Sequence, residues 1–427
     1  MNPACQTQKE IGLSEFTPAT QLELSRYVAE NAQGERRVLC PVGGRTALQY
    51  GFASPQPATS ISMTSLDRLV DYPARDMTIT VEAGMRVDAL QRTLAVERQR
   101  LPIDIAQAER ATLGGALATN TSGPRRYGHG TFRDYVIGIS AIDACGRLFK
   151  SGGRVVKNVA GYDLCKLLVG SRGTLAIVTQ VTLKLRPMPE TTAQLWGAIH
   201  SFDQIEACLQ ALLTSATRPV AIEVLNSPAA RLIATSARCD LPTSTPILCV
   251  GFEGLQREVD WQLETVTKEL ATIGPIGCHR VVHQDAERVW DALTEFQTCA
   301  DDPLTFEANM RPSQCMAFAA EATKRGVAVQ VHAGSGQVIG QLLEETATIN
   351  QSMAVLSELR RRAREHGGNL VVLHCDPEWK SQMPMCGDPE ASWPLMKQLK
   401  EKLDPDHLLN PQRFIDGALA AATSLRS

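Results

Sequence analysis

The pattern of apolar and polar positions predicts strands and helices in the first part of the chain. Residues 77–83 alternate between apolar and polar side chains, as a half-buried strand does. Residues 87–97 follow a helical period, and residues 18–31 predict another helix with its apolar side formed by leucine, tyrosine and valine. Residues 136–150 predict a hairpin that turns at Cys145-Gly146.

Residues 111–138 do not fit this pattern. The segment is rich in Gly, Thr, Asn and Ser, and it is too long for an ordinary connection between two elements. Long irregular segments inside compact domains usually carry function. We therefore expect an irregular functional segment here.

The pattern changes after residue 190, where glycine loops become rarer and strands alternate with amphipathic helices. Residues 257–271, for example, place an apolar side chain at every third or fourth position. Strand–helix–strand units with short connections predict an α+β layer, and no internal repeat is apparent. The expected domains are residues 1–190, residues 191–400, and a C-terminal segment, 401–427, that returns to the first domain.

Composition and charge narrow the function classes. The chain has 427 residues, of which 44% are apolar, and a formal net charge of -3. A nucleic-acid-binding protein would show a basic face or stripe. The single dense basic run, Arg360 to Arg364, precedes Gly367-Gly368 and is interpreted as the end of a helix, where cations favour the macrodipole.

The cysteines and the apolar runs exclude further classes. None of the twelve cysteines forms a C-x-x-C pair, so neither an iron–sulfur cluster nor a structural zinc site is expected. No run approaches the roughly 18 consecutive apolar residues that suggest a membrane-spanning helix, and the N-terminus does not resemble a signal peptide. The expected location is the cytoplasm, with any attachment to the inner membrane face made through partners.

The first candidate motif is the loop Pro41-Val42-Gly43-Gly44-Arg45-Thr46, which follows a short predicted strand. Successive N–H groups of a glycine turn can bind an anion, and glycine lets the backbone approach a pyrophosphate closely. The alternative is an ordinary turn, because glycine turns after strands are common.

The second candidate motif runs from Thr112 to Pro124 and consists mostly of small residues. Such residues let the backbone pack against a flat ligand, while Thr, Asn and Ser supply hydrogen bonds. Arg125 and Arg126 follow and would offset phosphate charge. The alternative is a surface loop with solvated arginines.

A third pair of motifs, Lys157–Leu164 and Val169–Leu175, names no chemistry by its spacing alone. The order of all these motifs, however, resembles the FAD-binding domain of the vanillyl-alcohol oxidase superfamily. Within that superfamily the chain is similar to the glycolate oxidase branch, whose C-terminal signature resembles residues 403–414. The resemblance implies a PCMH-type FAD-binding domain of two α+β subdomains, followed by an α+β, ferredoxin-like cap domain.

The resemblance also implies FAD as the cofactor. The glycine loop would wrap the pyrophosphate, the second motif would line the flavin and its phosphate side, and a later strand would pack near the ribityl or adenine end. The cofactor-binding residues expected in this way are Val42, Gly43, Gly44, Arg45, Thr46, Thr112, Gly114, Gly115, Asn120, Ser122, Gly123, Ile177 and Val178. Some relatives tether FAD through a histidine in the glycine loop, where this chain has Arg45, so FAD is expected to bind non-covalently.

The cap departs from the family pattern. Catalytic relatives in this branch carry H-x-x-G-D-G-N-x-H followed by E-H-G-I-G. Here only His332 and two glycines match the first motif, Ser335 replaces the acid, and Glu365 begins a partial match to the second. A metal usually needs three or more converging ligands, so no metal site is predicted. The alternative to a functional site is that His332 and His374 both have structural roles.

What the resemblance implies is an FAD-binding subunit of a glycolate or other D-2-hydroxy acid oxidising complex. Its partners would be a flavoprotein catalytic subunit and an iron–sulfur subunit. The candidate bases for the hydroxyl proton are His332 and His374, and Arg311 would hold the carboxylate, unless it is a solvated charge before a helix. Two alternatives remain: a self-sufficient FAD-dependent 2-hydroxy acid dehydrogenase, and a non-catalytic assembly subunit that holds FAD.

Overall fold

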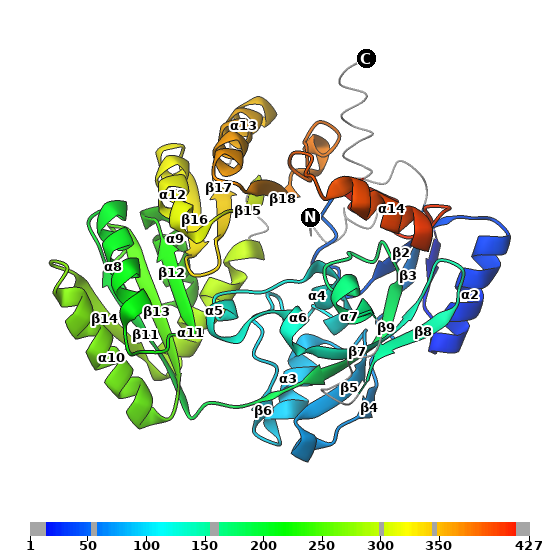
Figure 1. Ribbon diagram of the computed structural model, residues 1–427, viewed down its shortest axis with the longest axis horizontal. Helices are drawn as coiled ribbons and strands as arrows, with labels where there is room; N and C mark the ends of the chain where they lie inside the picture. The colour runs from blue at the N-terminus through cyan, green and yellow to red at the C-terminus, as the bar shows by residue number, and fades with distance from the viewer. Residues whose placement is uncertain (1–13, 53–57, 154–161, 299–302, 344–347, 416–427) are drawn as a thin grey trace. The chain divides into compact units, whose positions relative to one another are not determined.

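The structure is a computed structural model that describes residues 14–52, 58–153, 162–298, 303–343 and 348–415. The chain divides into two compact units (Figure 1). The first unit consists of Met1–Thr121, Thr131–Met188 and Lys380–Ser427. The second unit consists of Ser122–Gly130 and Pro189–Trp379. Each unit combines sheets with helices, which confirms the predicted α+β class.

The first unit contains a small parallel sheet at the N-terminal end of the chain. Its strands are β1 (Ser14–Phe16), β2 (Val38–Val42) and β3 (Ala58–Ser62), in the order β1-β3-β2. Helix α2 (Gln21–Gln33) begins at Thr20, whose side chain accepts a hydrogen bond from the Glu23 N–H. The helix buries Leu24 and Val28 in the same apolar cluster as residues of β2 and β3. This packing fixes the end of β2, where the glycine loop starts.

The first unit also contains a five-stranded antiparallel sheet in the order β4-β5-β9-β7-β8. The strands are β4 (Leu69–Asp71), β5 (Thr78–Glu82), β7 (Val136–Ile142), β8 (Leu148–Gly152) and β9 (Ile177–Lys184). The predicted hairpin is confirmed as β7 and β8, which turn at Gly146 with φ +81°. Helices α3 (Val87–Ala95), α4 (Leu113–Thr119) and α7 (Leu164–Leu168) share the apolar core of this sheet, and the short β6 (Gln99–Arg100) pairs with β10 (Arg186–Pro187).

The prediction of an irregular segment over residues 111–138 is wrong. The segment contains α4 and two single-turn helices, α5 (Arg126–His129) and α6 (Phe132–Tyr135). Thr112 caps α4 and Thr131 forms a capping box at α6, so threonines that were interpreted as loop residues begin helices instead. The small residues of α4 also let it approach β5, because a Cβ on Gly114 would lie 2.8 Å from the Ala83 side chain.

The second unit is built on one antiparallel sheet of eight strands, in the order β14-β11-β13-β12-β16-β17-β15-β18. The strands are β11 (Thr191–Ala198), β12 (Ala221–Leu225), β13 (Ile247–Gly254), β14 (Gly277–Val282), β15 (Leu304–Asn309), β16 (Val327–His332), β17 (Gln337–Leu342) and β18 (Asn369–Cys375). The helices are α8 (Phe202–Thr214), α9 (Ser227–Ala237), α10 (Gln256–Ala271), α11 (His283–Glu295), α12 (Cys315–Lys324) and α13 (Ile349–Glu365). The predicted helix over 257–271 is confirmed as α10.

This sheet contains the ferredoxin-like arrangement twice. Strands β11 to β14 follow the order 4-1-3-2, and β15 to β18 follow its mirror order 2-3-1-4, each with two helical crossovers. The two halves join where β12 pairs with β16. The repeat is therefore present in the topology, although no internal repeat was apparent in the sequence.

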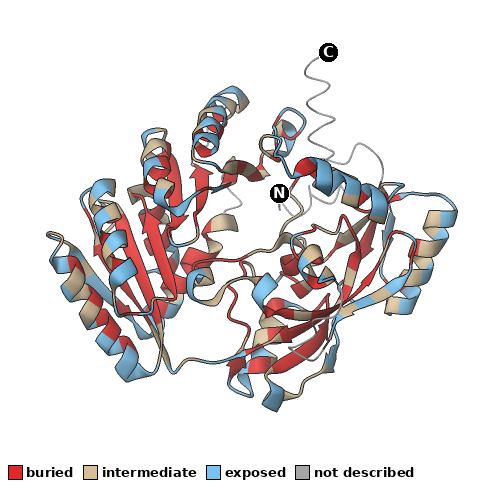
Figure 2. Cartoon of the chain, in the orientation of Figure 1, coloured by how far each residue is buried: buried red, intermediate tan, exposed pale blue. Residues whose placement is uncertain are grey.

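The two faces of this sheet differ in chemistry, and both are buried over the central strands, whereas the edge strand β14 is largely exposed (Figure 2). One face is apolar and is covered by α8, α10, α12 and α13. The other face contacts α11 and the turn after it: Trp290 Nε1 donates to Thr192 Oγ1, and Gln194 Nε2 donates to the Ala286 carbonyl. We call this second face the polar face. The buried polar side chains on it are Gln194, Glu223, Thr305, Gln330, His332, Gln337 and Gln341.

Candidate functional site

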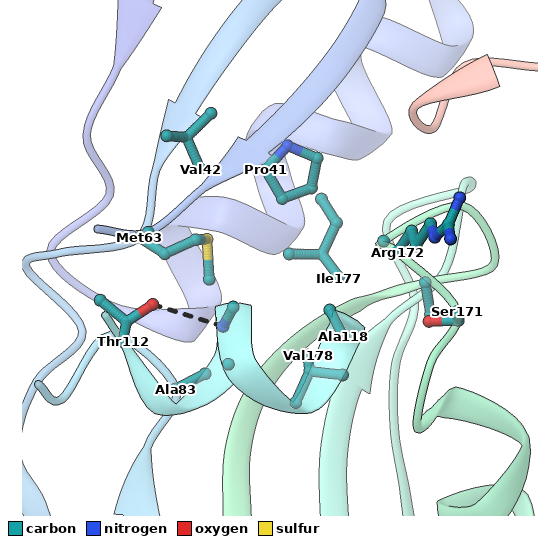
Figure 3. Close-up of a pocket in the computed structure, with 15 residues that line it drawn as sticks. Pro41, Val42, Met63, Ala83, Thr112, Ala118, Ser171, Arg172, Ile177 and Val178 are labelled. Atoms are coloured by element: carbon teal, nitrogen blue, oxygen red, sulfur yellow. Dashed lines mark hydrogen bonds between the residues drawn. The ribbon is translucent and has the colours of Figure 1, made fainter. Parts of the chain in front are cut away.

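In the first unit, a cavity lies where the end of β2, the start of α4 and the start of β9 meet (Figure 3). An adjoining cavity follows the glycine loop to the C-terminal segment. Ten of the expected cofactor-binding residues line one or both cavities: Val42, Gly43, Gly44, Arg45, Thr46, Thr112, Gly114, Gly115, Ile177 and Val178. Motifs that are far apart in the sequence thus come together around one site.

The glycine loop is packed directly against the start of α4. A Cβ on Gly43 would lie 1.9 Å from Thr112 Oγ1, and a Cβ on Gly44 would lie 1.7 Å from the Arg110 carbonyl oxygen. Thr112 Oγ1 also accepts a hydrogen bond from the Gly115 N–H at 3.3 Å, drawn as a dashed line in Figure 3. Only glycine fits at positions 43 and 44, so the backbone itself forms this wall of the cavity.

Polar atoms beside the two cavities have no hydrogen-bond partner within the described residues. Ser171 Oγ lines the first cavity, and Asn410 lines the second with its Oδ1 atom unsatisfied. Buried polar atoms are normally hydrogen-bonded, because leaving one unsatisfied costs about 1–3 kcal/mol. The two side chains therefore fit a polar ligand such as the ribityl or phosphate part of FAD.

The second cavity is also positively charged. The Arg413 guanidinium donates to the carbonyls of Ala47, Leu48 and Tyr50 at 3.1, 3.0 and 3.2 Å. Burial lowers the pKa of Arg413, and the nearby Arg172 lowers it further. Neither arginine forms an ion pair with a carboxylate of the described chain. Two cations that have no carboxylate partner among the described residues fit the pyrophosphate of FAD.

The C-terminal segment is held against this site by a fully buried lysine. Lys400 Nζ, on α14 (Trp393–Leu403), donates to the carbonyls of Thr174 and Leu409 at 2.7 and 2.9 Å. It also pairs with Asp404 Oδ2 at 2.5 Å. A buried cation is tolerated only with such partners, so Lys400 fixes the chain that places Asn410 and Arg413 at the cavity.

Three expected cofactor-binding residues do not line either cavity. Asn120 ends α4 in a left-handed conformation, with φ 52°. Ser122 and Gly123 lie in the segment that belongs to the second unit. The residues 157–161 of the third motif lie outside the described residues. A role for these positions in FAD binding stays a prediction.

In the second unit, the centre of the polar face holds a buried acid–imidazole pair. His332 Nδ1 lies 2.9 Å from Glu223 Oε1 and 2.8 Å from Glu223 Oε2. Gln330 Nε2 donates to Glu223 Oε2 at 2.7 Å. The pairing register places Glu223 directly opposite His332 on neighbouring strands, and all three residues are at most 5% exposed.

The segment Ser122–Gly130 contributes arginines to the second unit. The Arg126 guanidinium donates to Gln337 Oε1, which is its one hydrogen-bond partner within the described residues. Burial lowers the pKa of Arg126, although Glu307 and Glu223 act in the opposite direction. Because Gln337 pairs with His332 across β17 and β16, Arg126 is one side chain away from the imidazole.

The neighbouring arginine anchors the segment. Arg125 pairs with Glu253 at 2.9 Å and lies 5.1 Å from the centre of the Trp290 ring. His129 Nε2 lies 2.9 Å from the second oxygen of Glu253. The arginines that were expected to offset phosphate charge thus have partners within the second unit.

The segment His332–Gly336, which we call the eroded histidine motif, keeps two glycines because larger side chains would not fit there. A Cβ on Gly334 would lie 2.0 Å from the Tyr127 ring, which belongs to the same anchored segment. Gly336 has φ +73°, and its Cβ would lie 2.1 Å from the Met310 carbonyl oxygen. The motif therefore keeps the shape of its loop while its second histidine is absent.

The two candidate histidines are not brought together. His332 is level with Asn369 through the register of β16, β17, β15 and β18, whereas His374 is level with Thr305 at the other end of these strands. The separation is about 14 Å across the sheet and about 15 Å along it. No group of three or more metal-ligating side chains occurs within the described residues.

Arg311 is exposed, directly before the 3₁₀ turn Pro312–Gln314. It lies at the same end of the sheet as His332 but beyond the end of β15. Glu365 ends α13 and pairs with Arg361, in agreement with the interpretation of the basic run as a helix end. Arg126 is therefore linked to His332 through Gln337, and Arg311 stays a separate prediction.

Sequence reasoning missed Glu223, Gln330 and Gln337 as members of a site. A signal for them exists: β16 carries Gln330 and His332 at alternate positions, β17 carries two glutamines, and β12 carries one Glu, all among apolar or small residues. Alternation usually marks a solvated face. Here the strands that carry these amide and acid side chains alternate with helices along the chain. This indicates that helices cover the polar face.

Comparison with known proteins gives two matching families. The FAD binding domain matches residues 15–152, and the C-terminal domain of FAD linked oxidases matches residues 188–414. Glycolate oxidase subunit GlcD of Bacillus subtilis (strain 168) is 29% identical over 430 residues, covering 93% of this chain and 88% of that protein. D-2-hydroxyglutarate dehydrogenase of Xanthomonas citri pv. viticola is 27% identical, covering 92% and 88%.

A different glycolate oxidase subunit matches over a shorter stretch. Glycolate oxidase subunit GlcE of Escherichia coli (strain K12) is 38% identical over 128 residues, which is 30% of this chain and 37% of that protein. Among solved structures, p-cresol methylhydroxylase with substrate bound has a TM-score of 0.71 at 17% identity, covering 93% of this chain and 88% of that chain. 4-Ethylphenol oxidase from Gulosibacter chungangensis has a TM-score of 0.70 at 13% identity, with coverages of 94% and 89%. These structures confirm the predicted PCMH-type fold.

Proposed function

Because the chain belongs to the family of FAD-linked oxidases and is an FAD-dependent oxidoreductase, we propose that it oxidises a small 2-hydroxy acid such as glycolate. The observation that carries this proposal is the polar face, where Gln337 links an acid-paired imidazole to a half-buried arginine. A 2-hydroxy acid offers a hydroxyl to the first group and a carboxylate to the second. When bound, FAD supplies the acceptor for the hydride.

His332 is the proposed base. Its Nδ1 is occupied by Glu223, which leaves Nε2 to take the hydroxyl proton. Arg126 is the proposed partner of the carboxylate, because its guanidinium has only the Gln337 amide as a hydrogen-bond partner within the described residues. His374 is too far from His332 to act on the same hydroxyl, so we rank it second.

FAD is proposed to bind non-covalently along the two cavities of the first unit. The backbone of the glycine loop would approach the pyrophosphate, with Arg172 and Arg413 balancing its charge. Ser171 and Asn410 would satisfy their unpaired polar atoms on the cofactor. No histidine occupies the glycine loop, where Arg45 pairs with Glu15 at 3.2 Å.

We further propose that the chain works in a complex, with a second flavoprotein subunit and an iron–sulfur subunit that takes the electrons. This proposal rests on relatives that are named as glycolate oxidase subunits. The second candidate function is a self-sufficient dehydrogenase. The full-length match to D-2-hydroxyglutarate dehydrogenase and the complete acid–imidazole pair in this chain favour that candidate.

An anaerobic visible spectrum of the purified chain tests both candidates. Glycolate, D-lactate and D-2-hydroxyglutarate are added in turn, before and after addition of the partner subunits. Bleaching of the flavin by the chain alone supports the self-sufficient dehydrogenase, and bleaching only with partners supports the complex. A flavin that stays oxidised in every mixture would contradict 2-hydroxy acid oxidation and favour a subunit that only holds FAD.

A further inference from the structure

We propose that Glu223, itself held by Gln330, is the positioning residue that fixes the tautomer and orientation of His332. The inference rests on the proposed function only in naming His332 as the base. It is carried by three contacts on the polar face: both Glu223 oxygens approach the same ring nitrogen, and Gln330 binds one of those oxygens.

The contacts determine which ring nitrogen carries the proton. A carboxylate that receives a hydrogen bond from the Gln330 amide and contacts Nδ1 with both oxygens acts as an acceptor, so Nδ1 must be the donor. In a neutral imidazole the other nitrogen, Nε2, then has a free lone pair. His332 is thus prepared to accept a proton at Nε2 and at no other atom.

Burying the Glu223 carboxylate costs free energy, and packing of the sheet does not require an acid at this position. Glu223 is 1% exposed and lies in a five-residue strand, AIEVL, in which every residue is buried. Burying an acid without compensation is far less favourable than burying an apolar side chain of similar size. An apolar residue would serve the sheet at least as well, so we infer that the acid is kept for His332.

Arg126 and the two acids that act on it come from different elements. Glu223 is on β12, Arg126 is on the segment before α6, and Glu307 is on β15. Both acids act electrostatically on Arg126, but no ion pair of Arg126 with either carboxylate occurs within the described residues. The direct partner of Glu223 is therefore the imidazole, and Arg126 stays available for a substrate carboxylate.

The structure offers a matched pair of variants for the test. Glu223→Leu removes the acceptor, whereas Glu223→Gln keeps one amide oxygen that can receive the Nδ1 hydrogen. Glu253→Gln is the control, because Glu253 belongs to the same sheet, its side chain is only 3% exposed, and it contacts His129 instead of His332. Each variant is prepared as the full chain loaded with FAD.

The first readout is nuclear magnetic resonance of ¹⁵N-histidine-labelled protein, with His332 assigned by the loss of its signal in His332→Ala. We expect wild-type His332 to show the Nδ1–H tautomer, Glu223→Leu to show a mixture of tautomers, and Glu253→Gln to leave the His332 signal unchanged. Wild-type His332 in the Nε2–H tautomer, or an unchanged tautomer in Glu223→Leu, would overturn the proposal.

The second readout is the rate of flavin reduction by a 2-hydroxy acid. We expect kcat to fall about a hundredfold in Glu223→Leu and less in Glu223→Gln, with KM changed little, because the substrate carboxylate is bound elsewhere. Equal activity in the wild type, Glu223→Leu and Glu223→Gln would also overturn the positioning role. Because the tautomer is read without turnover, a wild type that no hydroxy acid reduces would contradict the proposed function and leave the tautomer assignment standing.

Discussion

The two units of this chain build their candidate sites in different ways. In the first unit, part of each cavity wall is backbone, brought close by Gly43, Gly44 and Gly114. In the second unit, the site consists of side chains on one face of a sheet, contributed by strands that are distant in the sequence. A site made of backbone depends on shape at a few glycines, whereas a site made of side chains depends on strand register.

This difference determines how each unit responds to mutation. An added side chain in a backbone-built site moves the wall itself, so binding of the cofactor fails. A substitution on a sheet face removes one functional group while the strands on either side keep the backbone in place. We therefore expect variants of the first unit to lose flavin, and variants of the polar face to keep flavin and lose rate.

The largest effect is expected for Gly44→Ala. The new Cβ would meet the Arg110 carbonyl oxygen at 1.7 Å, and neither backbone segment can yield cheaply. The purified variant should contain almost no FAD, measured as flavin absorbance relative to protein before and after incubation with the cofactor. Gly153→Ala is the control, because a Cβ there has nothing within 4 Å. Full flavin content in Gly44→Ala would show that the glycine loop does not form the cofactor site.

The next effect concerns the polar face. His332→Ala should slow flavin reduction by a 2-hydroxy acid about 10²-fold or more, because a positioned base is lost. Its flavin content should match the wild type, since His332 belongs to the second unit. His374→Ala, on the same sheet but about 14 Å away across it, should change the rate less than about threefold. A larger loss of rate in His374→Ala than in His332→Ala would indicate that His374 is the base.

A smaller effect is expected for Arg413→Met, which tests whether the positive charge beside the second cavity contributes to FAD binding. The variant loses a cation beside the second cavity, and hydrogen bonds to charged groups contribute about 1.5–3 kcal/mol. FAD affinity should therefore fall by about 10- to 100-fold, measured by quenching of flavin fluorescence on titration into apoprotein. Arg147→Ala is the control, because Arg147 is an exposed residue of the same unit that pairs with Asp143. A similar loss of affinity in both variants would indicate a general charge effect.

The contrast between the units also explains what the sequence could predict. Most residues around the cavities stand in local motifs, so the glycine loop and the small residues from Thr112 onward were recognisable as candidates without any tertiary information, although the helix α4 that these residues form was not predicted. Ser171 and Arg413 were not assigned to the site, because only the folded chain shows that they border its cavities.

In the second unit the α+β class followed from periodicity, but the site did not. Glu223 stands in an ordinary alternating strand, and its contact with His332 depends on the pairing of β12 with β16, more than 100 residues apart in sequence. Arg126 was expected near a phosphate because it follows the second motif. Its actual partner, Gln337, is 211 residues away. Register and long-range pairing are the properties that local patterns do not encode.

The smallest effect compares two glycines of the eroded histidine motif. Gly336→Ala places a side chain at φ +73° and 2.1 Å from the Met310 carbonyl oxygen, so it should destabilise the second unit by about 1–3 kcal/mol. Gly334→Ala meets the Tyr127 ring, which is 39% exposed and can rotate away, so its cost should stay below about 1 kcal/mol.

Urea unfolding followed by tryptophan fluorescence measures this difference, because four of the five tryptophans, all except Trp393, belong to the second unit. Both variants should keep their flavin, since neither glycine borders the cavities of the first unit. If Gly334→Ala proves the more costly of the two, then Tyr127 is held firmly in its place on the loop. The anchored segment Ser122–Gly130 would then be as rigid a part of the second unit as the sheet on which it packs, because a mobile ring would have absorbed the added methyl group.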